Sequence, residues 1–309
     1  MPQLKSISRK LYIWVNQMLY LGITPAPHRE HAIVSDKLII SLEGTIQITL
    51  DNGDKVTSRT CLVKAGINFE KSNIDTNKAV VAIFYIPALT QDYYAIESIM
   101  SYARNGVHYD HSEEADLITA LLNIRETSPA PELAFAMLRK LIVLPHLEDH
   151  TFKEFDERII EVARQIRTTV SENLSLKIFA DDVHLSESRL EKLFKDQIGI
   201  PITKYRLKYR VFIGIIHLAL GQSITEAALA AGFASSSHFS KSFSAINGIP
   251  PSETFLKPPF LNVLIADEVL NTLCILDQPS SDTKYTTQEV TPQRIQLGEY
   301  DEYLLTIQN

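Results

Sequence analysis

The chain has 309 residues, of which 45% are hydrophobic and 22% are charged. This composition is that of an ordinary globular protein with room for about two domains, and it excludes collagen, coiled-coil rods and disordered chains. The longest apolar run, residues 211–220, is far shorter than the roughly 20 residues that cross a bilayer, so the sequence predicts no membrane partner.

The net charge of −7 is unevenly distributed along the chain. Residues 1–156 carry 15 basic and 19 acidic side chains, residues 157–257 carry 13 and 10, and residues 258–309 carry 2 and 8. A segment with excess positive charge inside an acidic protein favours a nucleic-acid partner for that segment.

Residues 1–90 have the pattern of a β domain. Short β-rich runs alternate with turn residues, and the expected strands are Lys37–Leu42, Thr45–Leu50, Lys55–Val63 and Ala79–Ile86. The segment Asp51-Asn52-Gly53-Asp54 predicts a tight hairpin, because Asn-Gly adopts the positive φ angles of a type I′ turn at little cost.

Residues 91–150 change to helical spacing. The expected helices are Gln91–Ala103, Glu113–Arg125 and Pro131–Val143. Two apolar stripes follow from this spacing, one formed by Leu117, Leu121 and Ile124 and one by Leu133, Met137 and Leu141. These stripes predict core packing, and a homodimer interface is the alternative.

Residues 151–257 are predicted to form a separate all-α domain that contains an internal repeat, with helix-turn-helix units at about residues 176–197 and 224–246. In the first unit Ser186 is placed to cap the second helix. In the second unit Gly232 supplies the left-handed turn conformation, for which His184 is a poorer choice in the first unit.

The second helix of each unit has a polar face that could enter the major groove of double-stranded DNA. Lysine can donate to guanine, serine to several base edges, and glutamate can accept from cytosine. The candidate DNA-binding residues are Ser188, Arg189, Glu191, Lys192, Ser236, Ser237, His238, Ser240 and Lys241.

A long helix, residues 202–220, is expected between the two units. Its basic residues occupy alternate positions and are therefore spread around the helix: Lys204, Arg206, Lys208 and Arg210. We interpret them as solvated, with some available to contact phosphates.

Residues 157–257 resemble the DNA-binding domain of the AraC/XylS transcription regulators. The resemblance rests on the spacing of Ala228, Gly232-Phe233, Phe239 to Phe243 and Gly248 to Ser252. It implies two recognition helices in successive major-groove segments, with RNA polymerase as a partner. One departure is Gly214 in place of the usual Ala, which predicts a less rigid linker because glycine weakens a helix by ~1 kcal/mol.

The same family commonly has an N-terminal cupin-like β-barrel that binds a small effector or dimerises. The resemblance therefore implies an α+β multidomain fold, with a cupin-like β domain before the helices and the all-α domain after them. Candidate effector contacts are Tyr12, Trp14, His28 and His31. A regulator without an effector, controlled by a protein partner bound at residues 113–143, is the alternative.

A cupin-type metalloenzyme is the third possibility, and the sequence gives it little support. His28, Glu30 and His31 only partly match a cupin metal motif, and no matching later histidine is present. Two cysteines, Cys61 and Cys274, cannot form a disulfide framework or a cysteine-rich zinc site, which favours a cytoplasmic protein. We predict no cofactor, no metal and no enzymatic activity.

Residues 258–309 lie beyond the usual end of the family. Their apolar runs, 261–266, 269–276 and 302–307, predict short strands or a helix docked on another domain. Because the segment is acidic, it could compete with DNA for the basic domain, and we take autoinhibition as a hypothesis.

Overall fold

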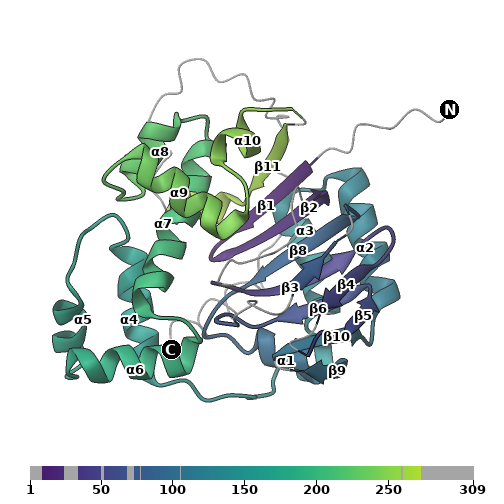
Figure 1. The fold of residues 1–309 in the computed structure, drawn as a ribbon, viewed down its shortest axis with the longest axis horizontal. Helices are drawn as coiled ribbons and strands as arrows, with labels where there is room; N and C mark the ends of the chain where they lie inside the picture. The colour runs from purple at the N-terminus through teal and green to yellow at the C-terminus, as the bar shows by residue number, and fades with distance from the viewer. Residues whose placement is uncertain are drawn as a thin grey trace. The chain divides into compact units, whose positions relative to one another are not determined.

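The computed structural model describes residues 9–23, 34–49, 52–67, 73–76, 78–104, 106–258 and 260–272 (Figure 1). All of them belong to one compact unit of the chain, Met1–Gln278. Pro279–Asn309 form the second unit and lie outside the described residues. Within the described residues, no helix is long and apolar enough to span a bilayer.

The β domain contains two sheets. The larger sheet has eight strands in the order β11-β1-β2-β8-β3-β6-β10-β9, and the smaller has three in the order β5-β4-β7. The strands are β1 (Arg9–Trp14), β2 (Gln17–Ile23), β3 (Asp36–Ser41), β4 (Ile46–Thr49), β5 (Lys55–Ser58), β6 (Thr60–Val63), β7 (Asn73–Asp75), β8 (Val80–Ile86), β9 (Met100–Arg104), β10 (Val107–His111) and β11 (Leu261–Ile265).

An apolar core lies between the two sheets. Ile46, Ile48 and Ile74 of the small sheet pack against residues of the large sheet that include Cys61 and Ile83, and all are nearly or fully buried. Alternate residues of a strand point to opposite faces, so β3, β6 and β8 of the large sheet also contribute to a second core on its other face. The cysteine thiol is therefore enclosed, and burial raises the pKa of Cys61 well above its ordinary value.

The Asn52-Gly53 hairpin forms as predicted. β4 and β5 pair in antiparallel register with Thr49 opposite Lys55, and Gly53 has a φ of 86°. The expected strand Lys55–Val63, in contrast, is divided into β5 and β6, which belong to different sheets. The break lies at Ser58, whose hydroxyl donates to the Thr60 carbonyl at 2.8 Å.

The helices α1 (Asp92–Ser98), α2 (Glu114–Thr127) and α3 (Pro131–Ile142) follow the strands. The expectation of a helix up to Ala103 was wrong, because β9 begins at Met100 and pairs with β10 around Gly106. The stripe expected on α3 is shifted by one residue. Ala134, Leu138 and Ile142 are the buried positions, whereas Leu133 is 56% exposed.

The opposite face of the large sheet is covered by α2, α3 and the turn between them. Tyr12 and Trp14 of β1 lie on this face, where the Tyr12 hydroxyl donates to the Pro129 carbonyl at 3.1 Å and Trp14 Nε1 donates to the Pro131 carbonyl at 2.8 Å. Lys10 Nζ donates to the Arg125 carbonyl.

The second domain is helical throughout, which confirms the expected α+β fold with an N-terminal β domain and a C-terminal helical domain. After a short 3-10 turn at Pro145–Leu147, its helices are α4 (Glu157–Thr168), α5 (Leu176–Asp182), α6 (Glu187–Ile198), α7 (Ile202–Ala219), α8 (Ile224–Ala230), α9 (Ser236–Asn247) and α10 (Pro251–Phe255). Strand β11 and helix α11 (Asp267–Thr272) come after them.

Candidate nucleic-acid interface

The first helix-turn-helix unit consists of α5, a turn at His184 and α6. The Leu185 N–H donates to the Ala180 carbonyl at 2.9 Å, which closes the turn. His184 has a φ of 55°, the left-handed conformation expected for it. The Ser186 hydroxyl accepts from the Arg189 N–H at 3.3 Å, so Ser186 caps α6 as predicted.

The second unit consists of α8, a turn at Gly232 and α9. The Phe233 N–H donates to the Ala228 carbonyl at 2.9 Å, which repeats the closing bond of the first unit. Gly232 has a φ of 76°, and a Cβ there would lie 2.7 Å from Ser171 Cα. Glycine is therefore required for two reasons, the backbone conformation and the close approach of the loop after α4.

Helix α6 presents a charged face. Leu190, Phe194 and Ile198 are buried against the rest of the domain. The residues on the other side are all exposed: Ser188, Arg189, Glu191, Lys192, Lys195 and Asp196. The predicted contacts of the first unit therefore lie together on one accessible surface, with donors and acceptors side by side.

Helix α9 presents a face that is mostly hydroxyl groups. Phe239, Ser242 and Phe243 are buried, Ser237, His238 and Lys241 are exposed, and Ser236 and Ser240 are half-buried. The His238 ring packs edge-on against Phe233 with centroids 5.2 Å apart, which restricts its orientation. Small side chains on this face let a helix approach base edges closely.

The linker helix α7 is packed against α9 at Gly214. A Cβ at this position would lie 2.5 Å from Phe239 Cε2. The expectation of a less rigid linker is not tested by this contact, but the contact gives a packing reason for glycine, because the Phe239 ring occupies the space of the missing side chain.

The basic residues of α7 are not generally solvated. Arg206 Nη1 donates to the Leu174 carbonyl at 2.6 Å, and Arg210 Nε donates to the Val170 carbonyl at 3.0 Å. These arginines hold the loop between α4 and α5, so their guanidinium groups already serve the fold. Lys204 is exposed, whereas Lys208 is half-buried against the β domain.

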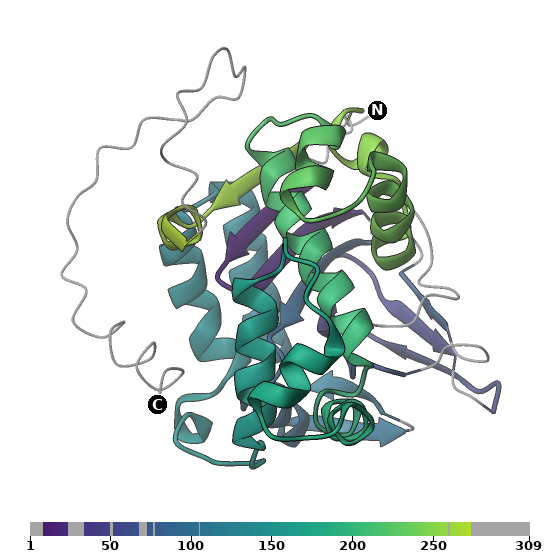
Figure 2. The ribbon, with the colours of Figure 1, turned by 90° about the vertical axis from the view of Figure 1, so that its left-hand side faces the viewer.

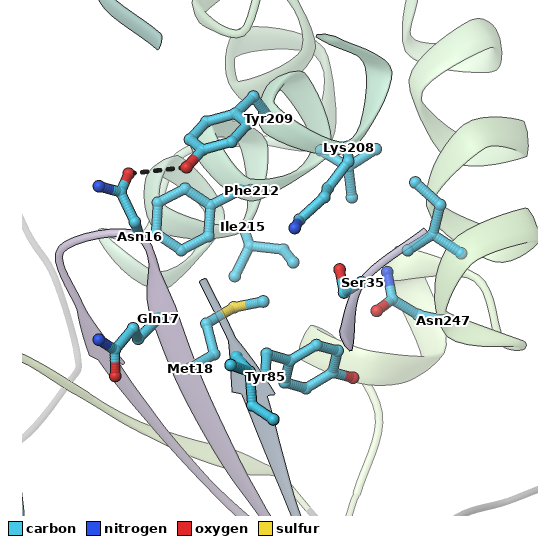
Figure 3. A pocket seen from close by; sticks show the side chains of 13 residues that line it. Asn16, Gln17, Met18, Ser35, Tyr85, Lys208, Tyr209, Phe212, Ile215 and Asn247 are labelled. Atoms are coloured by element: carbon cyan, nitrogen blue, oxygen red, sulfur yellow. Dashed lines mark hydrogen bonds between the residues drawn. The ribbon is translucent and has the colours of Figure 1, made fainter. Parts of the chain in front are cut away.

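A small cavity lies where α7 meets the β domain (Figure 3). It measures about 30 Å³, the room of one or two water molecules. Met18, Tyr85 and Ser35 line it from the β domain, and Lys208, Phe212 and Ile215 line it from α7. Beside it the Tyr209 hydroxyl donates to Asn16 Oδ1 at 2.9 Å and joins the two domains.

One lysine lines this cavity, and a second lies against the ring of the lining residue Tyr85. Figure 3 shows the Lys208 amine pointing into it, and Lys37 Nζ lies 5.1 Å from the centroid of the Tyr85 ring. Burial lowers the pKa of each lysine to about 8, and repulsion from Lys208 contributes to the lowering at Lys37. Asp36 lies close enough to favour the charged form of Lys208.

Sequence analysis missed this lysine pair. One signal was present, since Lys37 stands in the otherwise apolar run Leu38-Ile39-Ile40 of β3, where a charged residue is unusual. Its partner could not be recognised, because Lys208 has the same spacing as the structural arginines of α7.

The residues predicted to contact an effector are not brought together at the cavity. Tyr12 and Trp14 are buried against α3 and the turn before it, with their polar atoms hydrogen-bonded. His28 and His31, together with Glu30, lie outside the described residues. In the parts of the chain that the structure describes, no group of three or more His, Cys, Asp or Glu side chains could hold a metal ion.

Two helix-turn-helix units with exposed polar recognition helices define a DNA-binding protein. Residues 179–257 match the family model described as a helix-turn-helix domain. No curated protein matches the sequence.

Solved structures give further comparisons. An apo ToxT variant from Vibrio cholerae is 14% identical, with 77% of this chain and 96% of that chain covered and a TM-score of 0.54, which shows a shared fold. Wild-type ToxT from Vibrio cholerae with an unsaturated fatty acid bound is 15% identical, with coverages of 77% and 93% and a TM-score of 0.49. An AraC-type regulator from Chromobacterium violaceum is 32% identical over 31% of this chain and 88% of that chain, with a TM-score of 0.30.

Residues 179–257 are a helix-turn-helix domain of the AraC type. The family resemblance stated from the spacing of Ala228, Gly232 and Phe239 is thereby confirmed.

Proposed function

We propose that this DNA-binding regulator reads successive major-groove segments with α6 and α9 and is controlled by a small anionic effector. The observation that carries the effector proposal is the lysine pair, Lys37 and Lys208. One amine comes from each domain, and no ion pair within 4.0 Å is found for either among the described residues.

A buried amine without an ion pair is unfavourable, because the charge loses its hydration, and at Lys208 the attraction of Asp36 compensates only in part, since burial still lowers the pKa. An anion between Lys37 and Lys208 would replace that hydration with two charge-assisted contacts. The lining of Met18, Phe212 and Ile215 is apolar. An amphipathic carboxylate fits this combination, with its carboxylate at the amines and its hydrocarbon part against the apolar residues.

The cavity is too small for an effector to enter unless part of the protein moves. About 30 Å³ does not hold a hydrocarbon chain, so side chains or domains must move apart before the ligand binds. Since the two amines come from β3 and α7, a bound anion stabilises the docked arrangement of the two domains. The effector therefore acts on the helix that joins the two recognition units.

Two partners complete the proposal. RNA polymerase is the expected target of a regulator bound at a promoter, and a homodimer is expected from the half-exposed apolar side chains of α3. Leu133 is the most exposed of these. Sedimentation of the wild type and of Leu133→Glu tests the dimer, and a monomeric wild type would contradict it.

DNA binding is tested with the full-length protein and genomic fragments from its own locus across a salt series. Lys192→Ala and Lys241→Ala should each weaken specific binding by about 1–3 kcal/mol, because each removes a donor from a recognition helix. Lys204→Ala, on the exposed side of α7, is the matched control and should change specific binding less. Equal binding of all sequences by the wild type would contradict the proposal.

The effector is tested by thermal shift with a medium-chain or unsaturated fatty acid as the probe, because that ligand is present in one ToxT structure. At a concentration of 100 times its dissociation constant, a ligand adds ~2.7 kcal/mol of stability. Lys37→Met and Lys208→Met should abolish the shift, and Lys204→Met should not. No shift with any carboxylate would favour a regulator without an effector.

The lysine pair also predicts a pH dependence. Lys37 is nearly fully buried and has a folded pKa of about 8, below the ordinary 10.5. Between these values the unfolded chain binds the proton and the folded chain does not, so stability rises as pH increases from about 8 to 10.5, on the order of 2–3 kcal/mol. Chemical denaturation should show this rise in the wild type and a smaller rise in Lys37→Met, because Lys208 also has a lowered pKa. Anion affinity should fall over the same range, because the free amines lose their charge.

A further inference from the structure

The chain beyond the helix-turn-helix match returns to the β domain. Strand β11 adds to the edge of the large sheet by parallel pairing with β1, in a register from Arg9 with Leu261 to Ile13 with Ile265. The Ala266 N–H donates to the Ile13 carbonyl at 2.9 Å. A C-terminal segment therefore closes the sheet edge that an N-terminal strand would otherwise leave open.

Side-chain contacts on both sides of β11 support this pairing. Before it, Arg9 Nη2 donates to the Thr254 carbonyl at 3.2 Å, which joins β1 to α10. After it, the Asp267 N–H donates to Glu132 Oε1 of α3 at 3.3 Å. Ala266 and Val269 are 4% and 3% exposed. The described part of the acidic extension is thus bound to the β domain.

This attachment constrains the second helix-turn-helix unit. Helix α10 packs on α9, with the Phe243 and Phe255 rings 6.2 Å apart. Only residues 256–260 separate the end of α10 from the start of β11. A movement of α9 away from the β domain would therefore pull on β11.

The first unit has its own attachment. Gly199 ends α6 and lies against the turn at Ala65 and Gly66, so closely that a Cβ on Gly199 would be 2.6 Å from the Ala65 carbonyl oxygen. Lys153 Nζ donates to the Gln197 carbonyl at 3.3 Å, which ties the end of α6 to the segment before α4. Both recognition helices are consequently held at defined positions relative to the β domain.

The two recognition helices are attached to the β domain by separate contacts. In Figures 1 and 2, α6 and α9 lie at opposite ends of α7. Successive major-groove segments on one face of straight DNA are related by a shift of about one helical turn, ~34 Å, without rotation. Both units must match the spacing and direction of these segments at the same time, so separate attachments to the β domain restrict their adjustment to DNA.

We propose that residues 260–272 form a clasp, defined by the β11–β1 pairing and the docking of α11, that holds the second unit in an arrangement that disfavours DNA binding. Release of the clasp lets α9 reorient, and it is a step in binding DNA. This inference rests on the DNA-binding part of the proposed function and is independent of the effector. It also gives the autoinhibition hypothesis a different basis, strand pairing instead of charge competition.

Asn262→Pro tests the clasp with little other disturbance. Ala266 directs its N–H toward β1, and alternate residues of a strand direct their N–H groups to the same side, so the Asn262 N–H also points to β1. Its side chain is exposed, and proline removes only the ladder donor. Asn262→Ala keeps the donor and is the matched control.

We expect full-length Asn262→Pro to bind a DNA site, selected by the wild type from random duplexes, at least about fivefold more tightly. Hydrogen exchange of β1 and of residues 260–272 should be faster in this variant, while Asn262→Ala should resemble the wild type in both measurements. Unchanged or weaker DNA binding with faster exchange in the clasp would overturn the proposal. Failure of every protein to prefer any DNA sequence would instead contradict the proposed function.

A disulfide that keeps the clasp closed gives the converse test, and this test does not depend on destabilising the protein. Leu11 and Val263 are directly paired across β1 and β11, so cysteines at both positions, in a Cys274→Ser background, can form a disulfide that holds the clasp shut. The native Cys61 is fully buried and will not compete. The oxidised protein should bind the selected site at least about fivefold more weakly than the reduced protein. Equal binding by the two forms would remove the clasp from the mechanism.

Discussion

The two helix-turn-helix units share a turn but differ in what surrounds it. In each, the same backbone bond closes the turn, to the carbonyl of Ala180 in the first and of Ala228 in the second, at 2.9 Å in both. The first unit tolerates a histidine in the left-handed position and carries a charged recognition helix. The second requires glycine there, packs a phenylalanine ring into the space at Gly214, and carries a recognition helix rich in serine.

The difference shows that packing constrains the turn residues, whereas recognition concerns the exposed faces of α6 and α9. His184 is exposed, so its unfavourable φ is a local cost. Gly232 touches the backbone of Ser171, so a side chain there would displace a neighbouring segment. Substitutions at the turn position should therefore be tolerated in the first unit and not in the second. The exposed face of α6, in contrast, carries more kinds of charged and polar group than that of α9.

The largest expected effect is at the two turn positions. Gly232→Ala should destabilise the protein by about 2–4 kcal/mol, because the left-handed conformation and the contact with Ser171 are both unfavourable for alanine. His184→Gly should change stability by less than about 1 kcal/mol, in the stabilising direction, because relief of strain is partly offset by a more flexible unfolded chain. Denaturant unfolding measures both, and equal effects at the two positions would show that the turns are equivalent.

The next largest expected effect is on the recognition of DNA bases. Glu191 and Ser240 occupy corresponding positions on α6 and α9, and both contribute a polar atom to the candidate interface. Glu191→Ala should relax base preference at one position by about 1–3 kcal/mol. Ser240→Ala should change it by less than about 1 kcal/mol, because a half-buried neutral hydroxyl makes a weaker contact. Binding selections on randomised sites would measure both, and a larger change for Ser240→Ala would reverse the assignment.

The smallest effect is at Gly214. Alanine there gains ~1 kcal/mol of helix propensity but forces the Phe239 ring to move, at a cost of about 1–3 kcal/mol. We expect a net destabilisation of about 1 kcal/mol. In a Phe239→Leu background the ring is absent, so the same substitution should become neutral or stabilising. Additivity of the two changes in a double-mutant cycle would mean that Gly214 does not serve that contact.

Much of the fold was predictable because its signals are local. Asn52-Gly53 determines a hairpin through its own backbone preferences, and Ser186 and Gly232 mark helix boundaries by capping and by positive φ. The predictions that failed depended on pairing and packing with other elements. Residues 100–104 form a strand because they pair with β10 in a hairpin, and the buried stripe of α3 is set by where β1 lies.

The candidate site also has one part that local sequence patterns predict and one part that they do not. The exposed faces of α6 and α9 follow from helical periodicity once Leu190 and Phe239 are assigned to the core. The lysine pair does not follow from any local pattern. Lys37 and Lys208 are 171 positions apart in the numbering, and a single sequence contains no signal that joins them.

By itself, the sequence determined the helix-turn-helix units, their capping and turn residues and the resemblance to AraC-type regulators, because these depend on contacts within a few residues. Only the tertiary structure decided which basic residues of α7 serve the fold, that Lys37 and Lys208 lie close enough to repel each other, and that the chain beyond residue 260 pairs with β1. Each of these contacts joins residues that are more than thirty positions apart in the sequence. Which of these residues meet is decided by how whole helices and strands pack.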